Sequence, residues 1–349
     1  GLAMREQRVE DDRWGFKPSV TFFQAYDAVD MPALSNLTEG LVRPRFPGQV
    51  GLTYLQASYV FDWIEGSWGF ETVRAFLEGY RDDRTTEQLV DDLLGMSMEE
   101  ADGAFDLYLR DRFEREFAST AGERDDEAME DAAGGDLVFG DRTDEASIRL
   151  LRNAVEAFPE SFRFRLALGQ TLLGAGRLDE AETELREALR LFPAFPEEGG
   201  PLRGLAEIHE QRGETREAAD ALRRLGYLGE TQWAAPRREA ELRRELGDLE
   251  GEIDALRRAA EVFPFERDLQ LRRAEVAEAA GDATEWVRAR RAVLALDPVD
   301  RAEAHFQLAR ALRAADRSSE ARTQVLRALE IAPTFEAALE LLLELRGSA

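Results

Sequence analysis

Hydrophobic and polar positions in the second half of the chain repeat with a period close to 34 residues. A Gly or Asp marks each repeat, and the spacings between successive marks are 37, 34, 34 and 35 residues, for Gly176, Gly213, Gly247, Gly281 and Asp316. Each mark separates two stretches with helical periodicity, and Gly or Asp tolerates the positive φ of a tight turn between antiparallel helices. The period therefore predicts five consecutive helical hairpins.

The second helix of each predicted hairpin carries small and apolar residues on one face. Small residues allow the two helices to approach closely, as at Ala181, Ala218 and Ala321. Apolar residues follow four and seven positions later, which keeps one helix face buried: Leu185 and Ala188, Leu222 and Leu225, Leu256 and Ala259, Val325 and Ala328. A proline ends the second helix in most frames, at Pro193, Pro264, Pro298 and Pro333.

This pattern resembles the tetratricopeptide repeat over about residues 160–333. The resemblance implies an all-α fold: a right-handed α-solenoid of about five hairpins whose first helices line a concave groove for a protein or peptide partner. Glu252 and Trp286 stand where a small residue is usual, and the second hairpin has no closing proline, so we expect irregular packing there. Residues 144–158 look like a half repeat, and residues 334–346 look like the capping helix.

The N-terminal third has no such repeat, but from about Thr53 its apolar residues follow helical spacing. Capping boxes begin two helices, one at Thr85 with Gln88 and one at Ser97 with Glu100. Residues 14–50 are rich in Pro and Gly, which favours a long, partly extended excursion.

Four motifs in this N-terminal third resemble the C-terminal helical subdomain of the peptidase-MA-like zinc metallopeptidases, the gluzincin group: Tyr54–Ser58, Trp68–Gly69, Leu94–Ser97 and Tyr108–Leu109. Members carry a Glu-Gly-Leu-Ala segment whose Glu is the third zinc ligand, and this chain begins Gly1-Leu2-Ala3. The resemblance implies a fragment of a larger zinc metallopeptidase. Its His-Glu-x-x-His pair, third ligand and zinc would lie upstream, and the missing catalytic half would cover residues 1–118. The alternative is a non-enzymatic tetratricopeptide adaptor with an unrelated helical N-terminal domain.

These patterns divide the chain into three parts. By these resemblances, we expect residues 1–118 to form the C-terminal helical part of a peptidase-MA-like domain and residues 144–349 to form the tetratricopeptide repeat domain. Residues 119–143 are acidic, small and poor in apolar side chains, which is typical of a flexible linker.

Composition narrows the classes of partner. The 349 residues carry 45 basic and 71 acidic side chains, a net charge of -26, which repels nucleic acid and anionic lipid. No apolar stretch reaches the roughly 20 residues of a membrane helix, so we expect no membrane insertion. The sequence does not determine the compartment, and the lack of cysteine excludes thiolate metal sites.

Candidate catalytic chemistry is sparse in the chain itself. Its two histidines, His209 and His305, fall at packing positions in different hairpins, so we expect no metal site and no cofactor in this chain. Tyr54 and Tyr59 lie on the helix that borders the catalytic cleft in the resembled family. A tyrosine there could stabilise an oxyanion, and core packing is the alternative role.

Projecting the repeat frames places a mixed set of charged and polar residues on the groove face: Arg163, Gln170, Arg203, Glu207, Arg237, Glu241, Arg244, Glu275, Arg310 and Arg313. Arginine binds carboxylates through two parallel hydrogen bonds, so this set favours a partner with acidic side chains or a C-terminal carboxylate. The alternative is that these arginines pair with neighbouring glutamates on a solvated face.

We expect the chain as given to bind no catalytic zinc and to cleave no peptide, because two distant imidazoles cannot supply three donors around one metal ion. Metal analysis and a peptidase assay check this expectation. One zinc per chain, together with chelator-sensitive peptidase activity, would contradict it.

Overall fold

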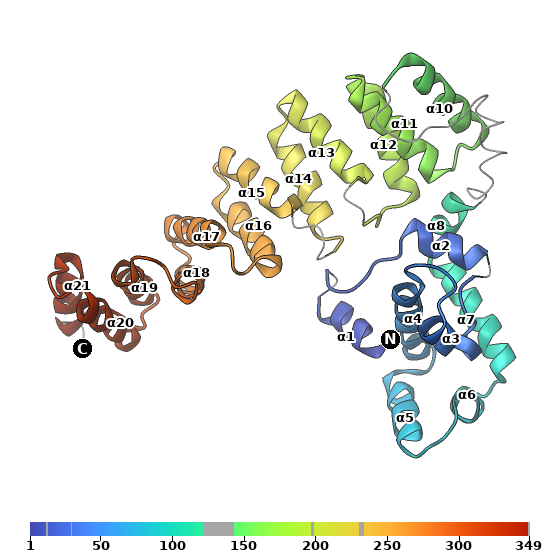
Figure 1. Cartoon of the computed structure of the whole chain (residues 1–349), viewed down its shortest axis with the longest axis horizontal. Coiled ribbons are helices and arrows are strands. Elements are labelled where there is room, and N and C mark those ends of the chain that lie inside the picture. Colours follow the sequence, from blue (N-terminus) through green and yellow to red (C-terminus); the bar gives the residue numbers. More distant parts are fainter. Residues whose placement is uncertain (12, 29, 122–142, 197–198, 230–233, 348–349) are drawn as a thin grey trace. The chain divides into compact units, whose positions relative to one another are not determined.

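The computed structural model describes residues 1–349 except 12, 29, 122–142, 197–198, 230–233 and 348–349. All regular elements among the described residues are helices, which confirms the predicted all-α class. The chain forms two compact units (Figure 1). The first contains Gly1–Gln211 and Tyr227–Gln232, and the second contains Arg212–Gly226 and Trp233–Ala349.

The N-terminal part of the first unit is built around the longest helix, α4 (Gln49–Trp68), which α1, α3, α5 and α7 contact. The other helices of this part are α1 (Leu2–Glu10), α2 (Val20–Asp27), α3 (Leu37–Val42), α5 (Phe70–Arg81), α6 (Thr86–Leu94), α7 (Met98–Arg112) and α8 (Glu114–Thr120). Both predicted capping boxes are present, at the starts of α6 and α7. The sequence therefore locates these two helix starts correctly.

The expectation of a partly extended excursion over residues 14–50 is wrong for much of that segment. It contains α2, the short 3₁₀ helix Leu34–Asn36 and α3. The Ser19 side chain accepts a hydrogen bond from the Phe22 amide and caps α2, and Phe22 and Phe23 are fully buried. Burial of these two rings and a capped N-terminus outweigh the local turn signals of Pro and Gly.

The N-terminal helices of the first unit share a core with the first hairpin. The Phe23 ring lies 4.9 Å from the ring of Phe117 on α8 and 5.6 Å from that of Phe192, between ring centroids. Helix α8 also contacts α11 (Phe162–Gly174) and α12 (Leu178–Leu191). The domain bounds at 118 and 144 stay a prediction, and most of the predicted linker, residues 122–142, lies outside the described residues.

The first unit also contains α10 (Glu145–Ala157) and most of α13 (Pro201–Arg212). The side chain of Leu185 on α12 packs between α11 and α13. A Cβ atom added at Gly169 on α11 would lie 2.7 Å from Leu185 Cγ, and one at Gly204 on α13 would lie 2.7 Å from Leu185 Cδ1. Both glycines therefore serve the close approach of helices around a fully buried leucine.

The second unit is a row of antiparallel helices, each in contact with the next (Figure 1). They are α14 (Thr215–Gly226), α15 (Ala234–Glu245), α16 (Leu249–Val262), α17 (Arg267–Ala280), α18 (Ala283–Ala295), α19 (Arg301–Ala314), α20 (Ser318–Ile331) and α21 (Glu336–Gly347). One face of α20 is fully buried at Ala321, Val325 and Ala328, as its spacing predicts. Helix α21 occupies the position of the predicted capping helix.

The five predicted turn residues all adopt positive φ. The angles are 73°, 73°, 68°, 73° and 57° at Gly176, Gly213, Gly247, Gly281 and Asp316. Helices α11, α13, α15, α17 and α19 end just before these turns. The repeat period thus locates each hairpin turn to the residue.

The two unusual residues of the repeat are buried in the second unit. Glu252 is 2% exposed, and its carboxylate accepts two hydrogen bonds from Arg272, at 2.7 Å from Nε and 3.1 Å from Nη2. Trp286 is 7% exposed, and the Arg310 guanidinium lies 5.4 Å from its ring centroid. A larger side chain is therefore accommodated at each position beside an arginine from the following first helix.

The second unit also contains buried ion pairs at other positions. Arg258 Nη2 lies 2.7 Å from Glu239 Oε2, with side-chain exposures of 3% and 1%. Burial raises the pKa of Glu239, and the charge of Arg258 opposes this shift. Such pairs must stay intact, since removal of one partner leaves an uncompensated buried charge.

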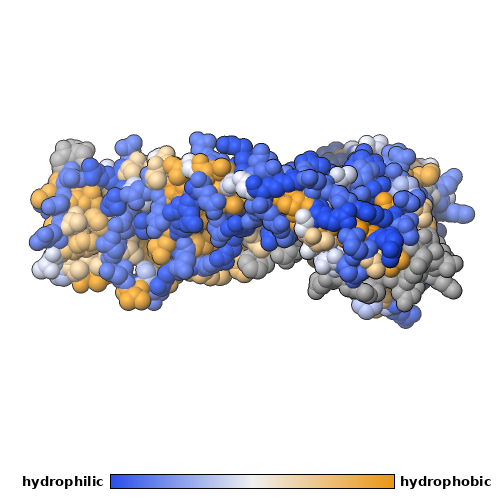
Figure 2. All heavy atoms as spheres, turned by 90° about the horizontal axis from the view of Figure 1, so that it is seen from above, coloured by the Kyte–Doolittle hydropathy of each residue, from blue (hydrophilic) through white to orange (hydrophobic). Residues whose placement is uncertain are grey.

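The surface in view in Figure 2 is mainly hydrophilic, with hydrophobic residues between the polar ones. Exposed apolar side chains of the second unit include Phe265 and Val299 in interhelix loops and Leu343 on α21. None of the described helices combines the length and the apolar character that crossing a membrane requires.

Gly169→Ala should lower the free energy of unfolding by about 1–3 kcal/mol, because the new methyl group must displace Leu185 in a packed core. Gly103→Ala is the matched control. Gly103 lies within α7 with open space around its Cβ position, so this change should raise stability by up to about 1 kcal/mol through helix propensity. Chemical denaturation of both variants measures the difference. Equal stability changes would show that Gly169 has no packing role.

Candidate functional site

A hollow of about 180 Å³ lies in the second unit, where α15 and α17 flank α16. Its lining comes from these three helices and the residue before α17: Arg237, Ala240, Glu241, Arg244, Glu252, Leu256, Glu266, Asp268, Leu269 and Arg272. Arg237, Glu241 and Arg244 were predicted as groove residues from the sequence.

The hollow combines an apolar base with a charged rim. Ala240, Leu256 and Leu269 are each at most 5% exposed, so their side chains form packed walls. Arg237, Glu241 and Arg244 are exposed around them. Such an arrangement accommodates one side chain of a bound segment and offers polar groups that fix its orientation.

Most rim arginines already hold a carboxylate. Arg237 Nη1 lies 2.8 Å from Glu266 Oε2, and Arg272 holds the buried Glu252. Arg244 is exposed and makes no ion pair with another described residue. Arg244 is therefore the rim arginine whose hydrogen-bond donors are accessible to a bound carboxylate.

The predicted groove residues further along the unit also have partners. Arg310 Nη2 lies 2.5 Å from Glu278 Oε1, and Arg313 pairs with Glu344 on α21. Glu275 lies 3.4 Å from Arg272 Nη1. These contacts fit the alternative of pairing on a solvated face. Exposed ion pairs contribute only about 0–1 kcal/mol each, so a partner's carboxylate can exchange with the internal one.

The remaining predicted groove residues belong to the first unit and form a separate set. Arg163 and Gln170 lie on α11, and Arg203 and Glu207 lie on α13. The Gln170 amide donates a hydrogen bond to the Gly199 carbonyl oxygen, and Glu207 accepts one from Gln211. Their participation in a groove stays a prediction.

The candidate tyrosines and the histidines lie in different settings. Tyr59 is 3% exposed, and the Arg8 guanidinium lies 4.7 Å from the centroid of the Tyr59 ring. Burial raises the pKa of the Tyr59 phenol well above its usual range. Tyr54 is exposed. His209 and His305 are both buried, and the His305 Nδ1 atom lies 2.7 Å from Gln324 Oε1. Within the described ranges, no group of three His, Asp or Glu side chains is placed to hold a metal ion.

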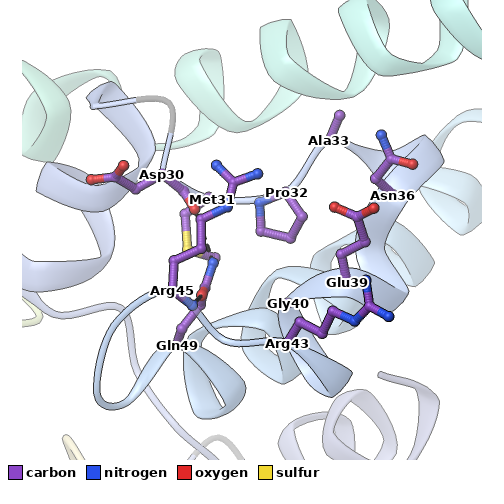
Figure 3. A pocket seen from close by; sticks show the side chains of 10 residues that line it. All are labelled: Asp30, Met31, Pro32, Ala33, Asn36, Glu39, Gly40, Arg43, Arg45 and Gln49. Carbon is purple, nitrogen blue, oxygen red and sulfur yellow. Dashed lines mark hydrogen bonds between the residues drawn. The ribbon is translucent and has the colours of Figure 1, made fainter.

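A second hollow, of about 210 Å³, lies in the first unit at the N-terminal end of α4 (Figure 3). The Gln49 amide closes one side by donating a hydrogen bond to the Asp30 carbonyl oxygen at 2.9 Å. Figure 3 shows Arg45 beside Met31 and Arg43 beside Glu39, on opposite sides of the hollow. This hollow has no signal in the sequence, because the Pro and Gly content of residues 14–50 favours an extended segment, whereas short helices form there.

With this geometry in view, comparison with known proteins supports the repeat assignment. Residues 145–196 match the family model described as "Tetratricopeptide repeat". This range contains α10, α11 and α12, so the resemblance to this repeat is confirmed for the first hairpin and the helix before it. No curated protein matches the chain.

Several solved structures are similar to parts of this chain. The protein YrrB, a tetratricopeptide protein with an unusual peptide-binding site, is 16% identical over 57% of this chain and 98% of its own, with a TM-score of 0.34. MamA from Desulfovibrio magneticus RS-1 is 16% identical over 50% of this chain and 96% of its own, with a TM-score of 0.30. PilF from Pseudomonas aeruginosa is 15% identical over 66% of this chain and 99% of its own, with a TM-score of 0.33.

Arg272→Met should lower the free energy of unfolding by about 2 kcal/mol, because it leaves the buried Glu252 carboxylate without its partner. We place the effect below that of a fully buried pair, since Arg272 is one-third exposed. The double variant Glu252→Leu/Arg272→Met should recover most of the loss. Denaturation of the single and double variants measures both effects, and a double variant as unstable as Arg272→Met would contradict the account.

Proposed function

We propose that this chain is a tetratricopeptide-type scaffold that binds a protein or peptide segment in the groove of its second unit. The hollow between α15 and α17 supports this proposal, because it combines an apolar base with the exposed Arg244. A side chain of the partner enters the hollow, and the charged rim fixes the direction of the segment.

Arg244 gives the groove a preference for a carboxylate next to the inserted side chain. A guanidinium binds a carboxylate through charge-assisted hydrogen bonds, which are about twice as strong as neutral ones. The net charge of -26 disfavours a strongly acidic partner through long-range repulsion. The preferred ligand is therefore a largely neutral segment with one or two acidic side chains.

A finer hypothesis concerns residues 1–118, whose motifs resemble those of peptidase-MA-like enzymes. In this hypothesis the groove recruits or holds the substrate of a larger zinc metallopeptidase, whose catalytic half packs against these residues. The family match at residues 145–196 does not extend to this part of the chain. The hypothesis stays a prediction, and the gene sequence upstream of Gly1 tests it. A His-Glu-x-x-His motif there, followed by a Glu just before Gly1, would support the enzyme.

The proposal predicts that Arg244→Glu weakens binding of a Glu-containing peptide about tenfold or more, because a charge-assisted pair is replaced by repulsion. A peptide array supplies the ligand: each peptide is paired with a copy in which Gln replaces Glu, and a peptide that binds only with Glu is then titrated by calorimetry. Binding should also weaken as salt rises, because the pair is partly exposed.

Arg327→Glu on α20 is the matched control. Arg327 is exposed, lies on a second helix of the same unit and makes no ion pair with another described residue, so its replacement alters the net charge equally. Its effect on the dissociation constant should stay within about twofold, the size expected of long-range charge alone. Equal losses in the two variants would refute a role for the hollow.

A further inference from the structure

Two hydrogen-bond donors are buried on one face of α18. Trp286 is 7% exposed, and its indole Nε1–H makes no hydrogen bond with another described residue. The Nε–H of Arg290 is likewise buried without such a bond. The two residues are four positions apart on the helix, so they lie on the same face. Buried donors of this kind normally have an acceptor, which makes the pair a candidate binding site.

A single carboxylate serves the cations around these donors. On α17, Glu278 Oε1 lies 2.5 Å from Nη2 of Arg310 on α19, and Glu278 Oε2 lies 4.0 Å from Nη2 of Arg290. The Arg310 guanidinium also lies 5.4 Å from the Trp286 ring centroid. Two guanidinium groups, one from α18 and one from α19, therefore lie near one carboxylate on α17, and the Trp286 ring lies beside the Arg310 guanidinium. Burial lowers the pKa of Arg290, and the charges of Glu278, Glu275 and Glu303 oppose this shift.

The site occupies the repeat position next to the hollow of the proposed groove. Glu252 and Leu256, five and nine residues after the turn at Gly247, line that hollow. Trp286 and Arg290 lie five and nine residues after the turn at Gly281. The same two positions thus supply a carboxylate and an apolar wall in one repeat, and two donors in the next.

We propose that the groove between α17 and α19 binds a carboxylate side chain of the partner segment. This carboxylate replaces Glu278 on Arg310 and Arg290 and accepts a hydrogen bond from Trp286 Nε1. The side chains of Glu278 and Arg310 are 33% and 39% exposed, so their ion pair can open toward solvent. The inference rests on the proposed function, because it adds a second contact point for the same bound segment.

The test follows the Trp286 indole N–H resonance by NMR in protein labelled with ¹⁵N-tryptophan, with the signal assigned through Trp286→Phe. The probe is N-acetyl-glutamate amide at constant ionic strength, and N-acetyl-glutamine amide is its neutral counterpart. We expect a saturable shift with the glutamate probe alone. A shift that the glutamine probe reproduces, or no shift at all, would overturn the proposal.

Two variants separate ligand binding from internal pairing. Arg290→Met should weaken the probe about tenfold, the loss expected of one charge-assisted hydrogen bond. Glu278→Gln should strengthen it, because the internal competitor is gone, whereas a merely structural ion pair predicts no gain. An unmoved Trp286 signal with intact Arg244-dependent peptide binding would overturn this site alone. If Arg244→Glu leaves peptide binding unchanged while the Trp286 signal still responds to the glutamate probe, the proposed role of the hollow is refuted instead.

Discussion

Close approach of antiparallel helices is the constraint on which the repeat part of this protein depends. The small residues five positions after a hairpin turn, Ala181, Ala218 and Ala321, are each fully buried. Close packing of this kind fixes the helix spacing and leaves little room for voids. Two repeats of the second unit place Glu252 and Trp286 at the same position, and the larger side chains have to be accommodated beside arginines of the following first helix.

Under the proposed function, this accommodation links stability to binding. Arg272 both holds the buried Glu252 and lines the hollow, and Arg310 both covers Trp286 and holds Glu278. Glu252 and Trp286, which stand where a small residue is usual, therefore bring guanidinium groups to the space between successive first helices. In the proposed binding mode, partly exposed pairs such as that of Arg310 with Glu278 exchange partners at low cost, since an exposed ion pair contributes little to stability. In this proposal, the same pairs orient the arginines toward the carboxylate of the bound segment.

The hairpin turns could be predicted to the residue, because a positive φ at a Gly or Asp is a local requirement that the sequence shows directly. The groove arginines could be projected onto a face, but their partners could not. Arg237 pairs with Glu266, whereas Arg244 has no carboxylate partner in the described part of the chain. This difference depends on side-chain geometry between helices that are not adjacent in sequence. The helices within residues 14–50 were missed because burial of Phe22 and Phe23 is a tertiary effect that overrides local turn signals.

The proposed binding mode depends on a contact between Arg244 and a carboxylate of the bound segment. A charge-reversal cycle tests it most directly: calorimetry of wild type and Arg244→Glu, each with the peptide carrying Glu or Lys at its sensitive position. We predict that the Lys peptide binds Arg244→Glu better than wild type, with a coupling energy of about 1–2 kcal/mol between the two positions. Additive losses, with no recovery in the doubly reversed pair, would contradict the claim.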